Sequence, residues 1–216
     1  MQYKKYKAWG VLFRLYHWCF ALSIIVLIAT GFYIANPWCA TDIEGNVGFP
    51  VANVRYIHFV AAFIFTAAVL VRVYLLFFGN KQERFWDFLP ITPRNIKNFF
   101  NTLLYYHYIT DKHDHRLGHN TLAGCLYILT LFLAVIQILT GFYMLYPESP
   151  KWQKLGLDLF GTQQQARFLH HILMWYFILF ALIHLYIVIW NDIKDPEGLI
   201  SSIFNGDKFM PVDKKS

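Results

Sequence analysis

Four long apolar segments constrain the fold of this chain more than any other feature of its sequence. They run over residues 15–35, 56–78, 121–146 and 168–190. Each is close to or longer than the roughly 20 residues that an α-helix needs to cross the hydrocarbon core of a bilayer. Because lipid offers no hydrogen-bond partner to the backbone, a segment that spans it has to be a helix. The sequence therefore predicts an all-α integral membrane protein, a bundle of four transmembrane helices.

The composition supports this membrane class. Of the 216 residues, 57% are hydrophobic and only 15% are charged, which is too apolar for an ordinary soluble domain. We expect a single membrane domain over residues 1–216, without an internal repeat. The first apolar segment is too long for the core of a signal peptide and is expected to be retained.

The distribution of Lys and Arg predicts the orientation in the membrane. With four spans, both termini and the connection between the second and third spans lie on one side. That side carries fifteen of the nineteen Lys and Arg residues, and the other side carries Arg55, Lys151, Lys154 and Arg167. The positive-inside rule then places both termini in the cytoplasm. The net charge of +6 is explained by this topology, and we expect no nucleic-acid partner.

The connection between the second and third spans contains a further predicted helix. Thr92 followed by Pro93 is typical of an N-cap and a first helical residue. Apolar residues then recur at spacings of three and four through residues 93–107. This helix would lie on the cytoplasmic membrane surface or pack against the ends of the spans, and the sequence leaves both arrangements open.

Histidines are placed at matching depths in different spans. His170 and His184 are fourteen residues apart in the last apolar segment. On a helix that spacing is a rise of about 21 Å and a return to within about 40° of the same face. His58 begins the second span at the outer depth of His170, and His17 begins the first span at the inner depth of His184. Each pair draws on two helices, which is the requirement for bis-imidazole ligation of a haem between helices.

The sequence therefore predicts two haems b, an outer one between His58 and His170 and an inner one between His17 and His184. His171 competes for the outer site. Its spacing from His184 turns it about 140° away from that face, so His170 is preferred. The chain has no C-x-x-C-H motif, so the haems would be held by ligation alone.

Two more spacings agree with two haem levels. Gly31 lies fourteen residues after His17, where the missing side chain would let the outer macrocycle approach the first helix. Gly31 could equally serve a helix–helix contact. Arg72 lies fourteen residues after His58 and would pair with a haem propionate or a quinone oxygen. The alternative for Arg72 is snorkelling to the cytoplasmic interface.

Several motifs resemble the b-type cytochrome subunit of membrane-bound nickel–iron hydrogenases. They are Arg14-Leu-Tyr-His17-Trp18, Arg55-Tyr-Ile-His58-Phe59, Arg72-Val-Tyr74, Gly118-His119-Asn120, His170-His171-Ile-Leu-Met174-Trp175 and His184-Leu-Tyr186. The resemblance covers nearly the whole chain. That family often has a proline after the Gly-His-Asn triplet, where this chain has Thr121.

The resemblance implies a di-haem membrane anchor in the bacterial cytoplasmic (inner) membrane. Electrons would come from the iron–sulfur clusters of a periplasmic hydrogenase small subunit, whose large subunit holds the nickel–iron centre. They would pass through the outer haem (His58, His170) and the inner haem (His17, His184) to menaquinone or ubiquinone. The chain would be the electron-transfer and quinone-reducing subunit of a hydrogen:quinone oxidoreductase, with the hydrogen chemistry in its partners.

Quinone reduction also needs protons near the inner haem. His119 and Asn120 precede the third span on the cytoplasmic side, close to the bilayer. Histidine titrates near physiological pH and suits proton delivery. We therefore expect His119 and Asn120 at the quinone and proton site.

Two rival functions are compatible with the same residues. One is the di-haem cytochrome b subunit of a formate dehydrogenase or a related oxidoreductase, which shares four helices and four histidines. The other belongs to a different class, a haem-free membrane anchor or transporter in which the histidines form a proton relay. Against it, no pair of broken helices and no inverted repeat is evident in the sequence.

Overall fold

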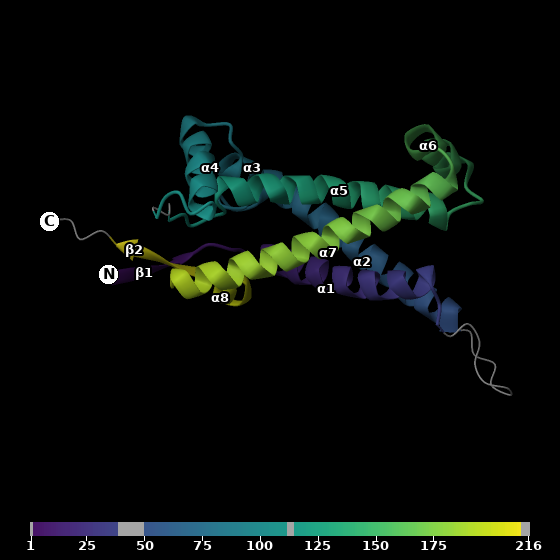
Figure 1. Ribbon diagram of the computed structural model, residues 1–216, viewed down its shortest axis with the longest axis horizontal. Helices are drawn as coiled ribbons and strands as arrows, with labels where there is room; N and C mark the ends of the chain where they lie inside the picture. The colour runs from purple at the N-terminus through teal and green to yellow at the C-terminus, as the bar shows by residue number, and fades with distance from the viewer. Residues whose placement is uncertain (1, 39–49, 112–114, 213–216) are drawn as a thin grey trace. The chain divides into compact units, whose positions relative to one another are not determined.

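The computed structural model describes residues 2–38, 50–111 and 115–212. Figure 1 shows the elements in chain order: β1 (Gln2–Lys7), α1 (Val11–Ala35), α2 (Pro50–Phe78), α3 (Phe85–Phe88), α4 (Pro93–Tyr106), α5 (Thr121–Leu145), α6 (Pro150–Phe160), α7 (Gln163–Lys194), α8 (Leu199–Asn205) and β2 (Asp207–Val212). The described chain is mostly helical, as the sequence predicts.

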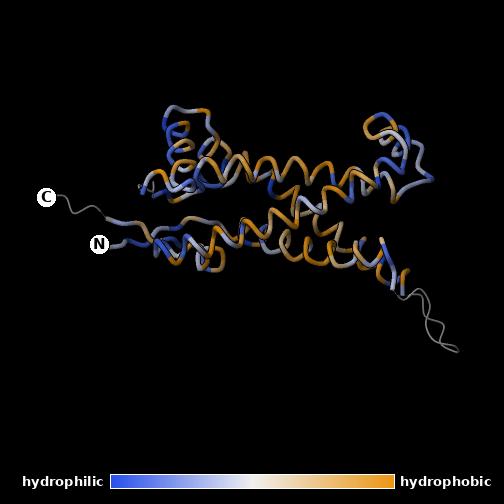
Figure 2. The backbone as a smooth tube through the Cα atoms, viewed as in Figure 1, coloured by the Kyte–Doolittle hydropathy of each residue, from blue (hydrophilic) through white to orange (hydrophobic). Residues whose placement is uncertain are grey.

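Four of these helices, α1, α2, α5 and α7, are long and apolar enough to cross a membrane. They cover the four predicted segments, and Figure 2 shows the hydrophobic residues along them in orange. Three helices extend further than the apolar segments: α1 begins at Val11, α2 at Pro50, and α7 covers Gln163–Lys194. Backbone hydrogen bonding continues past the hydrocarbon boundary because polar residues at a helix end can lie among the lipid headgroups.

Much of the apolar surface of these helices is exposed. In their most apolar stretches only 11% of the residues are buried in α1, 39% in α2 and 17% in each of α5 and α7. Leu22, Ile25 and Leu70 are all more than half exposed. A soluble protein rarely exposes so much contiguous apolar surface, whereas a bilayer covers it. The chain is a multi-pass membrane protein.

The prediction of an all-α fold is wrong at the two ends of the described chain. β1 and β2 pair as antiparallel strands, with Lys5 opposite Phe209 and Lys7 opposite Asp207. The Lys5 Nζ lies 2.9 Å from the Asp207 carboxylate. Local hydrophobic periodicity does not reveal a pairing between residues so far apart in the sequence. The pairing holds the two ends of the described chain together.

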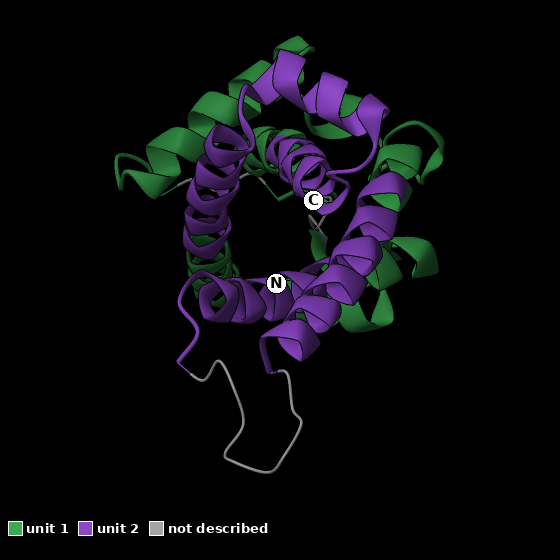
Figure 3. Cartoon of the chain, turned by 90° about the vertical axis from the view of Figure 1, so that its right-hand side faces the viewer, with its two compact units in different colours: residues 1–16, 71–132, 181–216 green, residues 17–70, 133–180 purple. Residues whose placement is uncertain are grey.

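The chain divides into two compact units, coloured in Figure 3. Unit 1 consists of Met1–Tyr16, Val71–Phe132 and Ala181–Ser216, and unit 2 of His17–Leu70 and Leu133–Phe180. Each of the four long helices contributes one part to each unit. The predicted outer histidines fall in unit 2, whereas the inner pair is divided between the units, with His17 in unit 2 and His184 in unit 1.

The core of unit 1 gathers around the beginning of α1. Trp9, Phe13 and Leu75 are buried against one another, and the Trp9 indole N–H donates to the Ser202 hydroxyl at 3.1 Å. Glu83 is 2% exposed, and its carboxylate accepts a hydrogen bond from the backbone N–H of Gly10 at 2.7 Å. Gly10 directly precedes α1, so this carboxylate caps the positive end of that helix dipole.

The helix α4 confirms the predicted N-terminus in the second connection. The Thr92 hydroxyl accepts from the backbone N–H of Asn95 at 3.2 Å, and Pro93 is the first helical residue. The buried side of α4 is polar, and it consists of Asn95, Asn98, Thr102 and Tyr105. Its apolar residues Ile96, Phe100 and Leu104 are exposed. The helix therefore packs on unit 1 through its polar side and leaves its apolar side uncovered by the described chain.

In unit 2, the short helix α6 follows the end of α5 and is anchored to it. Gly156 packs so closely on the Tyr143 ring that a Cβ there would clash with it. The Gln153 amide donates to the carbonyls of Tyr143 at 3.2 Å and Tyr146 at 3.0 Å. These contacts fix the connection between α5 and α7, and with it the start of α7 just before His170.

Candidate functional site

The two histidines predicted at the outer level both lie in unit 2. His58 is in α2 and His170 is in α7, and each is half-buried. His171 is exposed, and its ring centroid lies 6.4 Å from that of Trp175. The choice of His170 over its neighbour therefore agrees with the burial of the two rings.

Each of these histidines has a threonine partner on the preceding long helix. The Nδ1 atom of His58 lies 2.8 Å from the Thr30 hydroxyl of α1. The Nδ1 atom of His170 lies 2.8 Å from the Thr140 hydroxyl of α5. The two contacts have the same atoms and the same length, and His170 has a further hydrogen bond with the Gln137 backbone.

The threonine hydroxyls also determine which nitrogen of each ring carries the proton. A hydroxyl has one hydrogen to donate. The Thr30 hydroxyl donates to the Val26 carbonyl at 2.7 Å, and the Thr140 hydroxyl donates to the Ile136 carbonyl at 3.0 Å. Each hydroxyl therefore accepts from the histidine, so Nδ1 carries the proton and Nε2 carries the lone pair. That is the tautomer in which Nε2 can bind a metal while Nδ1–H is held by an outer partner.

A glycine follows each threonine and faces the same imidazole. A Cβ at Gly31 would lie 3.8 Å from the His58 Cε1 and 3.7 Å from the Met174 sulfur. A Cβ at Gly141 would lie 3.4 Å from the His170 Cε1. Both glycines therefore pack against the imidazole ring itself, and a larger side chain at either position would press on that ring. His58 and Met174 thus approach the first span at Gly31, and the approach of a macrocycle there stays a prediction.

These threonines and Gly141 were missed by sequence reasoning, although a signal was present. Residues 30–33 and 140–143 both read Thr-Gly-Phe-Tyr. The threonines precede their histidines by 28 and 30 residues, each time across one connection between helices. A shared tetrapeptide is too short to count as an internal repeat, and it stands out only when the two histidines are seen beside it.

The residues predicted at the inner level have aromatic surroundings. In unit 1 the His184 ring lies 6.0 Å from the Tyr127 ring, measured between centroids. The Tyr127 ring in turn lies 4.7 Å from that of His119. The His17 ring, in the first part of α1, lies 5.4 Å from the Trp18 ring, measured between centroids. The pairing of His17 with His184 stays a prediction from the sequence.

Arg72 is buried in unit 1 with an exposure of 4%, which contradicts the snorkelling alternative. Its Nη1 donates to the Glu83 carbonyl at 3.0 Å. The guanidinium also lies over the rings of Phe13, Tyr16 and Phe88, with its carbon 5.3 to 5.9 Å from their centroids. Aromatic faces stabilise a cation that is removed from water. Contact of Arg72 with a propionate or a quinone stays a prediction.

His119 and Asn120 lie at the beginning of α5, also in unit 1. The His119 ring stacks on Trp9 at 4.7 Å, and Phe13 and Phe88 lie about it at 6.0 and 6.1 Å. The Asn120 side-chain oxygen accepts from the backbone N–H of Ala123 at 2.7 Å, so it caps α5. The cap explains why α5 begins at Thr121 without the proline that the resemblance leads one to expect.

An aromatic groove in unit 1 was not predicted from the sequence. It has a volume of about 240 Å³ and is lined by Tyr106, Tyr108, Ile183, Tyr186, Ile187 and Trp190. The Tyr106 hydroxyl accepts from the Asn191 amide at 3.0 Å and is hydrogen-bonded to the Asn120 side chain. The groove therefore adjoins one predicted site residue, Asn120, and it flanks His184 along α7.

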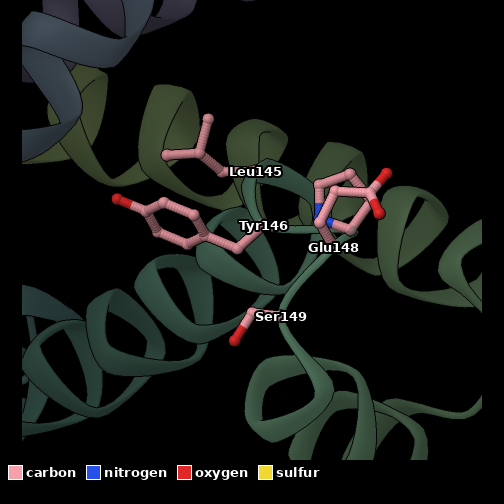
Figure 4. A pocket seen from close by; sticks show the side chains of 5 residues that line it. Leu145, Tyr146, Glu148 and Ser149 are labelled. Carbon is pink, nitrogen blue, oxygen red and sulfur yellow. The ribbon is translucent and has the colours of Figure 1, made fainter.

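A second pocket lies in unit 2 at the turn between α5 and α6 (Figure 4). It has a volume of about 300 Å³ and is lined by residues 145–149, with the Tyr146 ring on one side of it. None of the predicted site residues lines it, and it is separate from the histidine contacts described above.

Comparison with known proteins identifies the family of this chain. Residues 8–206 match the family described as prokaryotic cytochrome b561. A probable Ni/Fe-hydrogenase B-type cytochrome subunit of Cupriavidus necator is 34% identical over 202 residues, which cover 89% of this chain and 82% of the relative. One of Azotobacter vinelandii is 31% identical over 93% of this chain and 87% of its own length.

A more distant relative is the probable Ni/Fe-hydrogenase 1 B-type cytochrome subunit of Escherichia coli K12. It is 27% identical over 215 residues, 94% of this chain and 91% of the relative. The resemblance inferred from the histidine motifs is thereby confirmed. This multi-pass membrane protein belongs to the prokaryotic cytochrome b561 family.

Proposed function

We propose that this protein carries electrons across the bacterial inner membrane, from a hydrogenase on the periplasmic side to the quinone pool, through two haems b. The observation that supports this most is the matched pair of imidazoles in unit 2. His58 and His170 each donate Nδ1–H to a threonine hydroxyl and so present Nε2 for ligation.

A haem suits this arrangement of residues. Family membership implies a b-type haem, which is held by axial ligands without covalent attachment. His58 and His170 would be the ligands of the outer haem, and Gly31, which packs beside the His58 ring, would let the macrocycle edge approach the first span. When bound, the iron accepts and releases one electron at a time. The chain itself orients the imidazoles and surrounds the site with apolar helices that keep water away.

The second haem is proposed from the sequence alone. His17 and His184 would supply its ligands, and Arg72 lies in unit 1 as a buried cation for a propionate. Two haems at two depths would divide the crossing into steps short enough for electron transfer. Because fifteen of the nineteen Lys and Arg residues lie on one side of the spans, that side is proposed to be the cytoplasm.

The partner is proposed from the names of the relatives, which are cytochrome subunits of Ni/Fe-hydrogenases. The iron–sulfur small subunit would deliver electrons to the outer haem, and the nickel–iron large subunit would oxidise hydrogen. These names favour a hydrogenase over a formate dehydrogenase as the partner. Membership in a cytochrome family argues against the haem-free transporter.

The quinone would bind on the cytoplasmic side, near His119 and Asn120. His119 is enclosed by aromatic rings, and Asn120 is bonded to Tyr106, which lines the aromatic groove. A planar quinone ring, of menaquinone or ubiquinone, suits such a groove. The Tyr106 hydroxyl would donate a hydrogen bond to a quinone oxygen. Reduction to quinol consumes two electrons from the haems and two protons, which would be drawn from the cytoplasm through this side of the protein.

Haem stoichiometry tests the ligand assignment. We expect two haems b per chain in the purified complex, measured by a reduced-minus-oxidised visible spectrum with haem extraction. The His58→Ala and His170→Ala variants should each lose one haem. The matched control is His171→Ala, which removes the exposed neighbour of His170 and should keep both haems. Wild-type protein without haem, or ligand variants that retain both haems, would overturn the proposal.

Metal analysis of the native complex tests the partner. We expect nickel and iron to co-purify with this chain when the complex is extracted in mild detergent. Molybdenum or tungsten in place of nickel would reassign the chain to a formate dehydrogenase or a related oxidoreductase.

A further inference from the structure

We propose that Thr30 and Thr140 are positioning residues, whose hydroxyls fix the tautomer and ring orientation of His58 and His170 and thereby lower the redox potential of the haem that these histidines hold. This inference rests on the proposed function, in which the two histidines are axial ligands. It concerns two residues that lie outside the ligand set itself.

The two threonine hydroxyls donate to backbone carbonyls and accept from the histidines. Each hydroxyl donates its hydrogen to a carbonyl of its own helix, Val26 for Thr30 and Ile136 for Thr140. The bond to the imidazole can then run only from Nδ1–H to the hydroxyl oxygen. The opposite tautomer would place the proton on Nε2, where it would prevent ligation, and would leave Nδ1 facing an oxygen that has no hydrogen to give.

The hydrogen bond at Nδ1 would lower the reduction potential of an iron bound at Nε2. An imidazole whose Nδ1–H is hydrogen-bonded is a stronger electron donor through Nε2. A stronger donor stabilises ferric over ferrous iron, so it lowers the reduction potential. Both contacts are 2.8 Å long, and Thr140 is fully buried, so water does not compete for its histidine. We expect the two threonines to contribute in the same direction and to a similar extent.

The contact with a histidine distinguishes Thr30 and Thr140 from other threonines inside helices. Threonines inside helices often donate to the carbonyl four residues before them. Thr66 in α2 does so, with its hydroxyl 2.7 Å from the Ala62 carbonyl. The backbone bond alone therefore does not mark a special residue. The contact with a histidine nitrogen is the added feature of Thr30 and Thr140, and Thr66 supplies a matched control in the same unit.

A glycine follows each threonine, Gly31 after Thr30 and Gly141 after Thr140. In both Thr-Gly pairs the hydroxyl holds Nδ1 while the glycine stands beside Cε1 of the same ring. The pair therefore combines a hydrogen-bonding anchor for Nδ1 with a residue small enough to lie against the ring beside it. The same two residues serve both histidines, which favours a common role for the two tetrapeptides over two unrelated contacts.

The test is a redox titration of Thr30→Val and Thr140→Val in the purified complex, with both haem potentials measured optically and by electron paramagnetic resonance. Valine keeps the shape of threonine and removes the hydroxyl. We expect each variant to raise the potential of one haem and to leave the other unchanged, with a larger rise in the double variant. Serine at either position should restore the wild-type potential, and Thr66→Val should change neither haem.

Loss of one haem in the valine variants, with retention in the serine variants and in Thr66→Val, would also support the proposal, because the hydroxyl would then be needed to hold the ligand. Unchanged potentials in the valine variants would overturn it, as would equal shifts of both haems or a failure of serine to restore the wild type. His58→Ala and His170→Ala separate the two levels of inference. If they lose one haem while the valine variants behave like Thr66→Val, the ligands stand and the positioning role fails.

Discussion

The buried carboxylate of Glu83 lies 2.7 Å from the backbone nitrogen of Gly10, so one side chain from the connection after α2 caps the first residue before α1. The same carboxylate accepts from the backbone N–H of Asn80 at 2.9 Å. The backbone N–H groups of Gly10 and Asn80 thereby share one acceptor side chain. The contact ties the start of the first span to the end of the second.

Replacing Glu83 with alanine should therefore destabilise unit 1. The N–H groups of Gly10 and Asn80 would lose their acceptor. Because Gly10 is only half-buried and Asn80 is exposed, water can replace part of the loss, and we expect a total cost of about 1–3 kcal/mol. Glu83→Gln should cost less, because its amide oxygen can still accept one bond. Thermal unfolding in detergent measures the difference. Glu148→Ala, at an exposed glutamate, is the control and should leave the transition where it is. An unchanged transition in Glu83→Ala would contradict the capping role.

Substitutions at Gly31 should depend on the size of the new side chain. A Cβ there meets His58 and Met174 at ordinary contact distances, so we expect Gly31→Ala to keep both haems. Gly31→Leu would place a branched side chain beside the His58 imidazole and should displace the outer haem. Haem content per chain and the optical spectrum of each variant report the outcome. Retention of two haems in Gly31→Leu would mean that the macrocycle does not approach α1 at this glycine.

The hydroxyl of Tyr106 is expected to matter for quinone reduction and not for haem binding. Tyr106→Phe removes the proposed donor to the quinone oxygen while keeping the aromatic groove. We expect a fall of about 10²-fold in quinone reduction, in the range typical of a lost general acid. Haem reduction by hydrogen should be unaffected. Tyr108→Phe, which removes a hydroxyl from an exposed residue of the same groove, is the control. Equal rates in the two variants would argue against a quinone at Tyr106.

The pH dependence of that step follows from the surroundings of Tyr106. Burial raises the pKa of the Tyr106 hydroxyl, and this outweighs the opposing effect of its hydrogen bonds with Asn191 and Asn120. The ordinary tyrosine pKa is about 10, so the hydroxyl stays protonated and able to donate throughout the range from about pH 6 to 9. Quinone reduction should show no loss through this group below about pH 10. A decline near neutral pH that disappears in Tyr106→Phe would contradict this assignment.

The sequence predicts the spans and the outer histidines because both follow from local rules. Hydropathy marks the hydrocarbon part of each helix, and a fourteen-residue spacing sets the face and depth of His170 and His184. The Thr92 cap and the start of α4 are equally local, since they depend on adjacent residues. Even so, the orientation of α4 was beyond such rules. Its polar side is buried because the Asn98 side chain accepts from the backbone N–H of Thr121, on another helix.

The features that the sequence does not predict all depend on contacts between distant segments. The pairing of β1 with β2 joins the two ends of the described chain, and neither strand has the alternation that would reveal it alone. Thr30 and Thr140 read as ordinary helix residues until their histidine partners are placed beside them. The aromatic groove combines the end of α4 with the last turns of α7. Each requires the tertiary arrangement within a unit, which periodicity does not supply.

Two ion pairs involve β2 and differ in burial. Lys208 lies 3.0 Å from the Glu197 carboxylate, with side-chain exposures of only 3% and 5%, and His115 contacts the same carboxylate. Removing one member of such a pair leaves the other charge buried, so we expect Lys208→Met to cost about 3–5 kcal/mol. The pair of Lys5 with Asp207 is more exposed, and Lys5→Met should cost at most about 1 kcal/mol.

Thermal unfolding of the two methionine variants in detergent measures this contrast, and a double variant identifies its cause. If the cost of Lys208→Met comes from the carboxylate left without its cation, then Glu197→Gln in the same chain should recover part of the stability, because a neutral amide is cheaper to bury than a charge. If the cost came instead from the lost lysine stem, the second substitution would only add to it. Equal losses in Lys5→Met and Lys208→Met would show that burial does not govern the strength of these pairs.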